Sequence, residues 1–227
     1  KMKKIIILYD FLKELGGLER VMFFQANVLR KKYNVELAFS HISKKEKNSI
    51  IKELELEKEI RVYQINRGKN EILNLAKSFL NSNKLNKTKS DLVISHSFMS
   101  TRIAAKKKKK EKTPLIVFMH HPPNFLYKPA KGWANNPARI LAKIVGIFLN
   151  KYLKRLDIKS VRNADLVLCN SNYTAKRIKK IYGVKSEVVY PCLSDFFKII
   201  TKKEVEDYKK ENNINGHFLL AHGRVIP

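Results

Sequence analysis

The sequence contains few of the residues that mark several common classes of protein. Its 227 residues include two cysteines, Cys169 and Cys192, eight glycines, seven prolines and one tryptophan. Two cysteines provide neither a disulfide framework nor a four-cysteine metal site, so we expect a reducing, cytoplasmic compartment. The low glycine and proline contents exclude a collagen-like or low-complexity chain. No uninterrupted apolar run approaches the ~20 residues that a membrane-spanning helix needs.

Acidic residues are also scarce. The chain has 47 Lys and Arg against 20 Asp and Glu, which gives a formal net charge of +27. Residues 101–162 alone hold 16 basic and two acidic side chains. The electrostatic field of such a large positive charge attracts polyanions such as nucleic acids, anionic lipid headgroups or phosphate-bearing small molecules. A Lys-rich solvated surface is the simpler interpretation.

Short apolar, β-branched runs alternate with helical patterns along nearly the whole chain. This alternation predicts an α/β fold, a Rossmann-like parallel sheet with helices on both faces. The long insertion Pro122–Pro137 reads as a structured loop at the end of a buried strand, where ligands bind in open α/β sheets. The predicted strands are Lys4–Leu8, Val35–Phe39, Ile60–Ile65, Leu92–Ser95, Leu115–Met119, Leu166–Cys169, Val188–Tyr190 and Phe218–Ala221. The predicted helices are Leu18–Lys32, Lys45–Leu54, Glu71–Leu80, Met99–Lys110, Arg139–Arg162, Tyr173–Ile181 and Lys203–Glu211.

A pair of glycines follows the first predicted strand. Asp10–Leu15 is expected to form a loop, after which Gly16 and Gly17 open a helix. Glycines there let the backbone approach a ligand closely, and the free N–H groups of the helix can hold a phosphate or a hydroxyl. A tight turn into the helix is the structural alternative. The dinucleotide fingerprint is absent, which disfavours a nicotinamide cofactor.

Two histidines stand at the ends of buried strands. His120 follows Leu115–Met119 and His96 follows Leu92–Ser95, where an imidazole can donate a hydrogen bond to a substrate or transfer a proton. Neither has an Asp or Cys at a spacing that indicates a metal site or a nucleophilic triad. Ser171 follows the strand Leu166–Cys169, and its residue type is typical of an ordinary helix N-cap.

Six stretches match, in order along the chain, motifs of one family. With them the sequence resembles the family-4 retaining glycosyltransferases, in particular their mannosyltransferase-like branch. Asn124 stands where that branch has Arg, and Cys192 replaces the second Pro of its "VIYPP" segment. Gly16–Arg20 resembles the Gly-Gly-Ala-Glu-Arg loop, His120–Pro123 the His-Thr-Pro-Pro-Arg segment and Leu153–Asp157 the "LRxWD" segment; Asn170–Gly183 resembles "NS…RI…YG", Val189–Pro191 "VIYPP" and Gly223–Pro227 "SRLVPYK".

The resemblance implies an enzyme of GT-B fold, in which two Rossmann-like domains face each other across a cleft. Residues 1–215 would be the N-terminal, acceptor-side domain, and residues 216–227 the first strand and linker toward a missing C-terminal, donor-binding domain. The fragment alone is expected to be inactive.

The resemblance also implies roles for individual residues. Gly16 and Gly17 would approach the donor diphosphate and the acceptor, and His120 would contact the transferred sugar. His96 and Asn124 are further binding candidates, while Ser171 and Arg177 would support the wall of the cleft. The implied co-substrate is a UDP- or GDP-linked sugar, with no cofactor and no metal.

The expected acceptor is a glycan or a lipid-linked molecule. The basic residues around the predicted acceptor loop could hold the protein at an anionic membrane surface, which would place it at the inner face of the cell membrane. Two other functions compete. A basic nucleic-acid-binding α/β module would explain the charge but lacks interleaved aromatics and a recognition-helix signature. A carbohydrate phosphorylase or sugar-nucleotide epimerase could use the same fold.

Overall fold

The computed structural model describes residues 2–13, 16–43, 47–53, 58–66, 88–127, 137–191 and 200–216, with short pieces at 56, 70, 73–74, 77–78 and 85. For residues 137–148 it describes the backbone. The chain divides into two compact units, residues 1–191 and residues 192–227.

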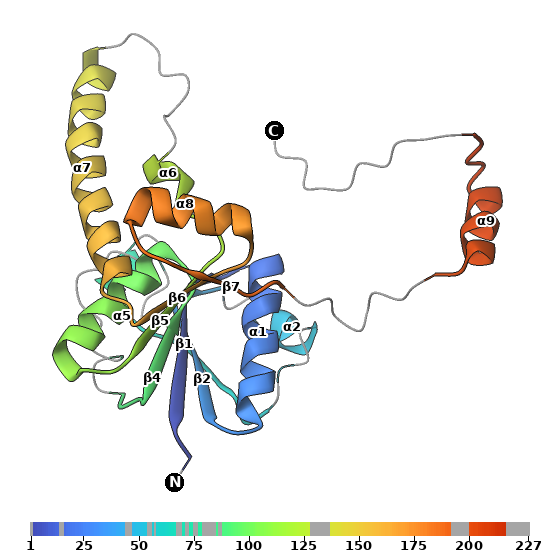
Figure 1. Ribbon diagram of the computed structural model, residues 1–227, viewed down its shortest axis with the longest axis horizontal. Coiled ribbons are helices and arrows are strands. Elements are labelled where there is room, and N and C mark those ends of the chain that lie inside the picture. Colours follow the sequence, from blue (N-terminus) through green and yellow to red (C-terminus); the bar gives the residue numbers. More distant parts are fainter. Residues whose placement is uncertain are drawn as a thin grey trace. The chain divides into compact units, whose positions relative to one another are not determined.

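The first unit is built on a seven-stranded sheet (Figure 1). The strand order is β3-β2-β1-β4-β5-β6-β7, and every neighbouring pair is parallel. The order reverses between β1 and β4, which makes their carboxyl ends the switch point of the sheet. The predicted parallel α/β fold is confirmed. The strands are β1 (Lys4–Leu12), β2 (Asn34–Ile42), β3 (Arg61–Gln64), β4 (Leu92–Ser95), β5 (Leu115–Met119), β6 (Leu166–Cys169) and β7 (Glu187–Val188).

Helices cover both faces because the two halves of the sheet are wound in opposite directions from β1. Alternate residues of β1 point to opposite faces, so that Ile5 and Ile7 pack with α1 while Ile6 and Leu8 pack with α5. In Figure 1, α7 extends beyond the carboxyl edge of the sheet, near which α6 and α8 also lie. The helices of this unit are α1 (Gly17–Arg30), α2 (Lys47–Glu53), α5 (Phe98–Glu111), α6 (Asn124–Tyr127), α7 (Pro137–Arg162) and α8 (Asn172–Tyr182).

Two local predictions are wrong. The loop expected from Asp10 is instead the continuation of β1, which runs to Leu12. A buried carboxylate is tolerated there because backbone N–H groups of α5 bind it. The insertion after β5 also begins with a short helix, α6, rather than a loop. The predicted strand Phe218–Ala221 and most of the predicted helix Glu71–Leu80 lie outside the described residues.

The second unit contains helix α9 (Lys202–Glu211). Its N-cap is Thr201, whose hydroxyl accepts the backbone N–H of Glu204 at 3.2 Å, while the carboxylate of Glu204 accepts the backbone N–H of Thr201. This reciprocal capping box explains why so polar a segment is helical. Over the part of the chain that the structure describes, no helix has the length and apolar character to cross a membrane.

Candidate functional site

The carboxyl ends of β1, β4 and β5 bring polar side chains together at the switch point. His96 follows β4, His120 follows β5, and Asp10 lies near the end of β1. Ligands of open α/β sheets bind outside the carboxyl ends of the strands at such a point. This edge is therefore the candidate functional site.

His96 and His120 are in direct contact. The Nδ1 of His96 lies 3.1 Å from the Nε2 of His120, and the two rings stack with an interplanar angle of 24°. Phe118 packs edge-on against His96. His96 is 4% exposed, and its Nε2 has no hydrogen-bond partner within the described ranges. One nitrogen of the contact donates and the other accepts, so each ring fixes the tautomer of the other.

Both imidazoles are neutral at physiological pH. Burial, and then the neighbouring His121, lower the pKa of His120 to about 4. Burial, and then the charge of His120, hold the pKa of His96 well below its usual value of 6.5. The charged form of a buried imidazole is disfavoured because it loses its hydration. The pair can therefore offer a ligand a neutral N–H donor.

Asp10 connects β1 to the first turn of α5. Its carboxylate accepts the backbone N–H of Ser100 at 2.7 Å and that of Met99 at 3.2 Å. Burial raises the pKa of Asp10 to about 6, although hydrogen bonds from Ser97, Ser100 and Met99 act in the opposite direction. Carboxylates are stabilised at helix N-termini by the free N–H groups and the helix dipole. Asp10 thereby holds the helix that begins directly after His96.

The two glycines at the start of α1 have different surroundings. The backbone N–H of Gly16 donates to the Oε2 of Glu19 at 3.1 Å, and a Cβ on Gly16 would lie 2.6 Å from that oxygen. A side chain at position 16 would therefore displace the Glu19 carboxylate from the helix cap. A Cβ on Gly17 would meet no atom of the described residues within 4 Å. Packing does not require glycine at position 17, which leaves room for close approach of a ligand.

The predicted cleft-wall residue Ser171 is the N-cap of α8. Its hydroxyl accepts the backbone N–H of Thr174 at 3.2 Å. The hydroxyl of Thr174 lies 3.3 Å from the backbone carbonyl oxygen of His120 and 2.9 Å from the Oδ1 of Asn170. Ser171 thus supports the backbone that carries His120 and is one step removed from the histidine pair.

The other two predicted residues lie apart from the histidine pair. Asn124 is the exposed first residue of α6. Arg177 lies on α8 with its guanidinium carbon 6.0 Å from the centroid of the Tyr173 ring. The structure records no contact between either residue and the two histidines, within the residues it describes.

Two of the sequence motifs meet in a buried cluster beside the site. Asp157 of α7 accepts the hydroxyls of Tyr182 at 2.7 Å and Tyr127 at 2.8 Å. Burial raises the pKa of Asp157, while the two hydroxyls lower it. The cluster joins α6, α7 and α8, so these motif residues hold the helices around the site rather than forming it. Within the described ranges, no group of three His, Cys, Asp or Glu side chains could hold a metal ion.

The sheet is all-parallel, polar side chains gather at its switch point, and Gly17 leaves space at the start of α1. These features define a Rossmann-like domain of the type that forms each half of GT-B transferases. The chain belongs to Glycosyltransferase Family 4, whose family model matches residues 15–194. No curated protein sequence gives a significant match.

Several solved structures share the fold. HepE from Anabaena in complex with UDP superposes with a TM-score of 0.60 at 13% identity, over 92% of this chain and 50% of that one. Sucrose-phosphate synthase from Thermosynechococcus elongatus gives a TM-score of 0.60 at 11% identity, over 94% and 53%. The lipopolysaccharide outer core galactosyltransferase WaaB gives 0.53 at 22% identity, over 84% and 46%. The chain spans about half the length of these proteins and corresponds to the N-terminal half of the GT-B fold.

Proposed function

We propose that the chain is the acceptor-side half of a retaining glycosyltransferase of the mannosyltransferase-like branch. It would help to move a sugar from a UDP- or GDP-linked donor to a glycan or lipid-linked acceptor in the cytoplasm. Membership of Family 4 supports sugar transfer. The HepE structures with UDP and with UDP-glucose support a nucleotide-linked donor. The order of the sequence motifs supports the branch.

The neutral histidine pair carries the proposal. His96 is buried, and its Nε2 has no partner among the described residues. An unpaired buried N–H is rarer in proteins than an unpaired acceptor. We therefore assign the proton of His96 to Nδ1, which donates to the Nε2 of His120. The remaining proton of His120 is then on its Nδ1, where it can donate to a hydroxyl of the transferred sugar. A neutral donor fixed in place needs no protonation before each turnover.

Gly17 and the start of α1 are proposed to face the donor diphosphate. The N-terminus of a helix favours an anion through its free N–H groups and its dipole. The absence of any Cβ at Gly17 lets the diphosphate approach the backbone. Gly16 would have the separate task of allowing the capping contact with Glu19.

The carboxylates described at this edge are already bound to backbone groups. Asp10 accepts N–H groups of α5, and Glu19 accepts the N–H of Gly16. Retaining glycosidases use two carboxylates separated by about 5 Å on either side of the reacting bond. Asp10 and Glu19 do not suit that chemistry. We therefore propose that the leaving diphosphate takes the proton of the acceptor hydroxyl, as in a transferase.

Sugar transfer by the longer protein expected to contain this chain would test the proposal. Radiolabelled UDP-glucose and GDP-mannose would be supplied with a membrane extract as the source of acceptors, and the anomeric configuration of the product determined. We expect a labelled product with retained configuration from one of the two donors. Free sugar phosphate or an epimerised nucleotide sugar as the main product would contradict the proposal, as would an inverted product.

A further inference from the structure

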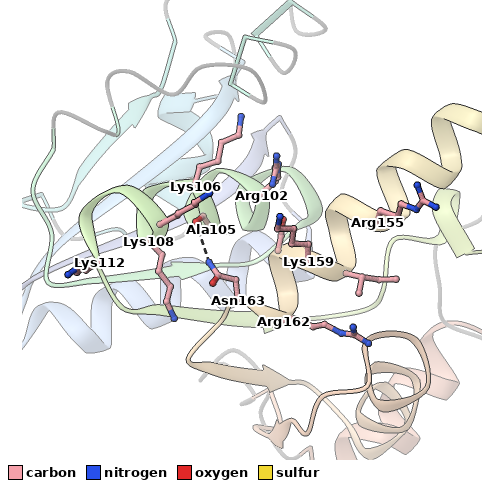
Figure 2. Close-up of a pocket in the computed structure, with 12 residues that line it drawn as sticks. Arg102, Ala105, Lys106, Lys108, Lys112, Arg155, Lys159, Arg162 and Asn163 are labelled. Carbon is pink, nitrogen blue, oxygen red and sulfur yellow. Dashed lines mark hydrogen bonds between the residues drawn. The ribbon is translucent and has the colours of Figure 1, made fainter.

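Eight basic side chains line a groove between α5 and α7 (Figure 2). The groove has a volume of about 1000 Å³ and twelve lining residues. Five of these, from α5 and its C-cap, are Lys or Arg, as are three from α7, and none of the twelve is Asp or Glu. The basic stretch seen in the sequence is therefore gathered by the fold onto one concave surface.

The groove is separate from the histidine site. α5 begins at the carboxyl edge after β4 and ends before β5 begins, so it crosses the face of the sheet toward the opposite edge. Lys109 lies near its C-terminal end, and Lys159 and Arg162 lie near that of α7. Lys107, in the same lysine tract, is fully buried and binds the carbonyl oxygen of Thr88 instead. In the tract Lys106–Lys110, Lys107 is thus structural, whereas Lys106, Lys108 and Lys109 line the groove.

Part of the groove's charge is balanced within the protein. Lys108 pairs with Asp165, and the Nε of Arg162 donates to the backbone oxygen of Tyr182. Burial, and then the charge of the nearby Arg102, lower the pKa of Lys106. Figure 2 shows cationic side chains from both helices around the same space. Like charges held together favour an anionic partner.

Two exposed apolar side chains lie on α7 on the N-terminal side of its groove residues. Leu149 is 53% exposed and Tyr152 is 55% exposed. Residues three, four or seven apart lie on one side of a helix, which places Tyr152 beside Arg155 and Lys159. A tyrosine and a leucine next to basic side chains are typical of a surface that inserts into the interface of a bilayer. None of the residues lining the groove is aromatic, whereas single-stranded nucleic acids bind on aromatic stacking platforms.

We propose that the α5–α7 groove, with Leu149 and Tyr152 beside it, docks onto an anionic phospholipid surface. The lysines and arginines would contact headgroup phosphates, and the two apolar side chains would enter the interfacial layer. This inference extends the proposed function by assigning the protein a membrane-binding face. It does not depend on sugar transfer, because vesicle binding can be measured with no donor present.

Vesicle cosedimentation of the chain tests this inference. Phosphatidylcholine vesicles with and without phosphatidylglycerol would be compared for the wild type and for the triple variant Lys109→Gln, Arg155→Gln and Lys159→Gln. All three side chains are exposed, so the fold should tolerate the changes. The control variant Lys31→Gln, Lys32→Gln and Lys52→Gln removes the same charge from exposed positions at α1 and α2. Circular dichroism and thermal melting verify that each variant is folded.

We expect the wild type to bind only the vesicles that contain phosphatidylglycerol. Each basic residue near an anionic surface contributes about a fivefold gain in binding, so the groove variant should bind about 100-fold more weakly. The control variant should stay within about tenfold of the wild type, and added salt should weaken binding in every case. Leu149→Ser with Tyr152→Ser should also weaken binding without a change in charge.

Three results would overturn the inference. The first is no wild-type binding to anionic vesicles at about 0.15 M ionic strength. The second is an equal loss in the groove and control variants, which would mean that net charge alone is responsible. The third is displacement from vesicles by a short RNA at concentrations below those of accessible lipid, which would identify a nucleic acid as the preferred partner.

Discussion

Replacing Asp10 by Asn should change how the stability of the chain depends on pH. Asp10 is 6% exposed, and burial raises its pKa from 3.8 to about 6. A shift of one unit corresponds to 1.36 kcal/mol, so burial of the charged form costs about 3 kcal/mol when the group is fully ionised. Because folding raises the pKa of Asp10, its contribution to the free energy of unfolding is fully present below pH 3.8. That contribution is lost as the pH rises through about 6.

The Asn side chain has nearly the same shape, keeps one oxygen acceptor for α5 and does not ionise. Integrating over the titration of Asp10, the wild type loses about 2 kcal/mol of its free energy of unfolding between about pH 4.5 and 7.5. The free energy of unfolding of Asp10→Asn, relative to the wild type, should therefore increase by that amount over this range. Urea unfolding followed by circular dichroism at several pH values measures it. Asp207→Asn, an exposed position on α9, controls for the change in net charge.

Parallel stability profiles for Asp10→Asn and the wild type would refute this reasoning. They would mean that Asp10 has a similar pKa in the folded and unfolded states. A relative loss for Asp10→Asn as the pH rises would also refute it, because that sign belongs to a carboxylate whose pKa is lowered by folding.

Three further predictions concern the site and its support. Imidazole ¹⁵N NMR should show His120 neutral and protonated on Nδ1 from about pH 5 to 8, because its pKa is about 4; titration near pH 6.5 would contradict this. Gly16→Ala should destabilise the fold by about 1 kcal/mol through loss of the capping hydrogen bond. Gly17→Ala should leave the melting temperature unchanged but reduce sugar transfer by the longer protein. Equal melting temperatures for the two variants would contradict this distinction between the glycines. Tyr182→Phe removes one of two hydroxyl donors to the buried Asp157 and should lower the free energy of unfolding in urea by about 2 kcal/mol. An unchanged midpoint would contradict the role of this cluster in stabilising the fold.

The sheet could be predicted from the sequence because each strand is a short run of β-branched and apolar residues. The predicted bounds of β4, β5 and β6 agree with the structure. Ser171 was expected as a helix N-cap from its residue type, and the structure confirms this local role. The strands and the N-cap depend on residues that are adjacent in the sequence, so the local sequence pattern is enough to predict them.

The contacts that build the site depend on residues far apart in the chain. The prediction that Asp10 begins a loop is wrong because its partners in α5 are 89 and 90 residues away. The sequence placed His96 and His120 at strand ends, but only the adjacency of β4 and β5 brings their rings together. The basic groove has the same origin. Its basic side chains come from α5 and α7, which are separated in the sequence by β5 and α6.

Sugar transfer with and without the imidazole of His120 tests the central claim most directly. In the longer protein, His120→Ala should lower kcat about 100-fold, because one fixed donor to the reacting sugar is lost. His121→Ala removes the adjacent exposed imidazole and should keep most of the activity. Full activity of folded His120→Ala with UDP- or GDP-linked donors, or an equal loss in both variants, would contradict the assignment of this edge of the sheet as the sugar-transfer site.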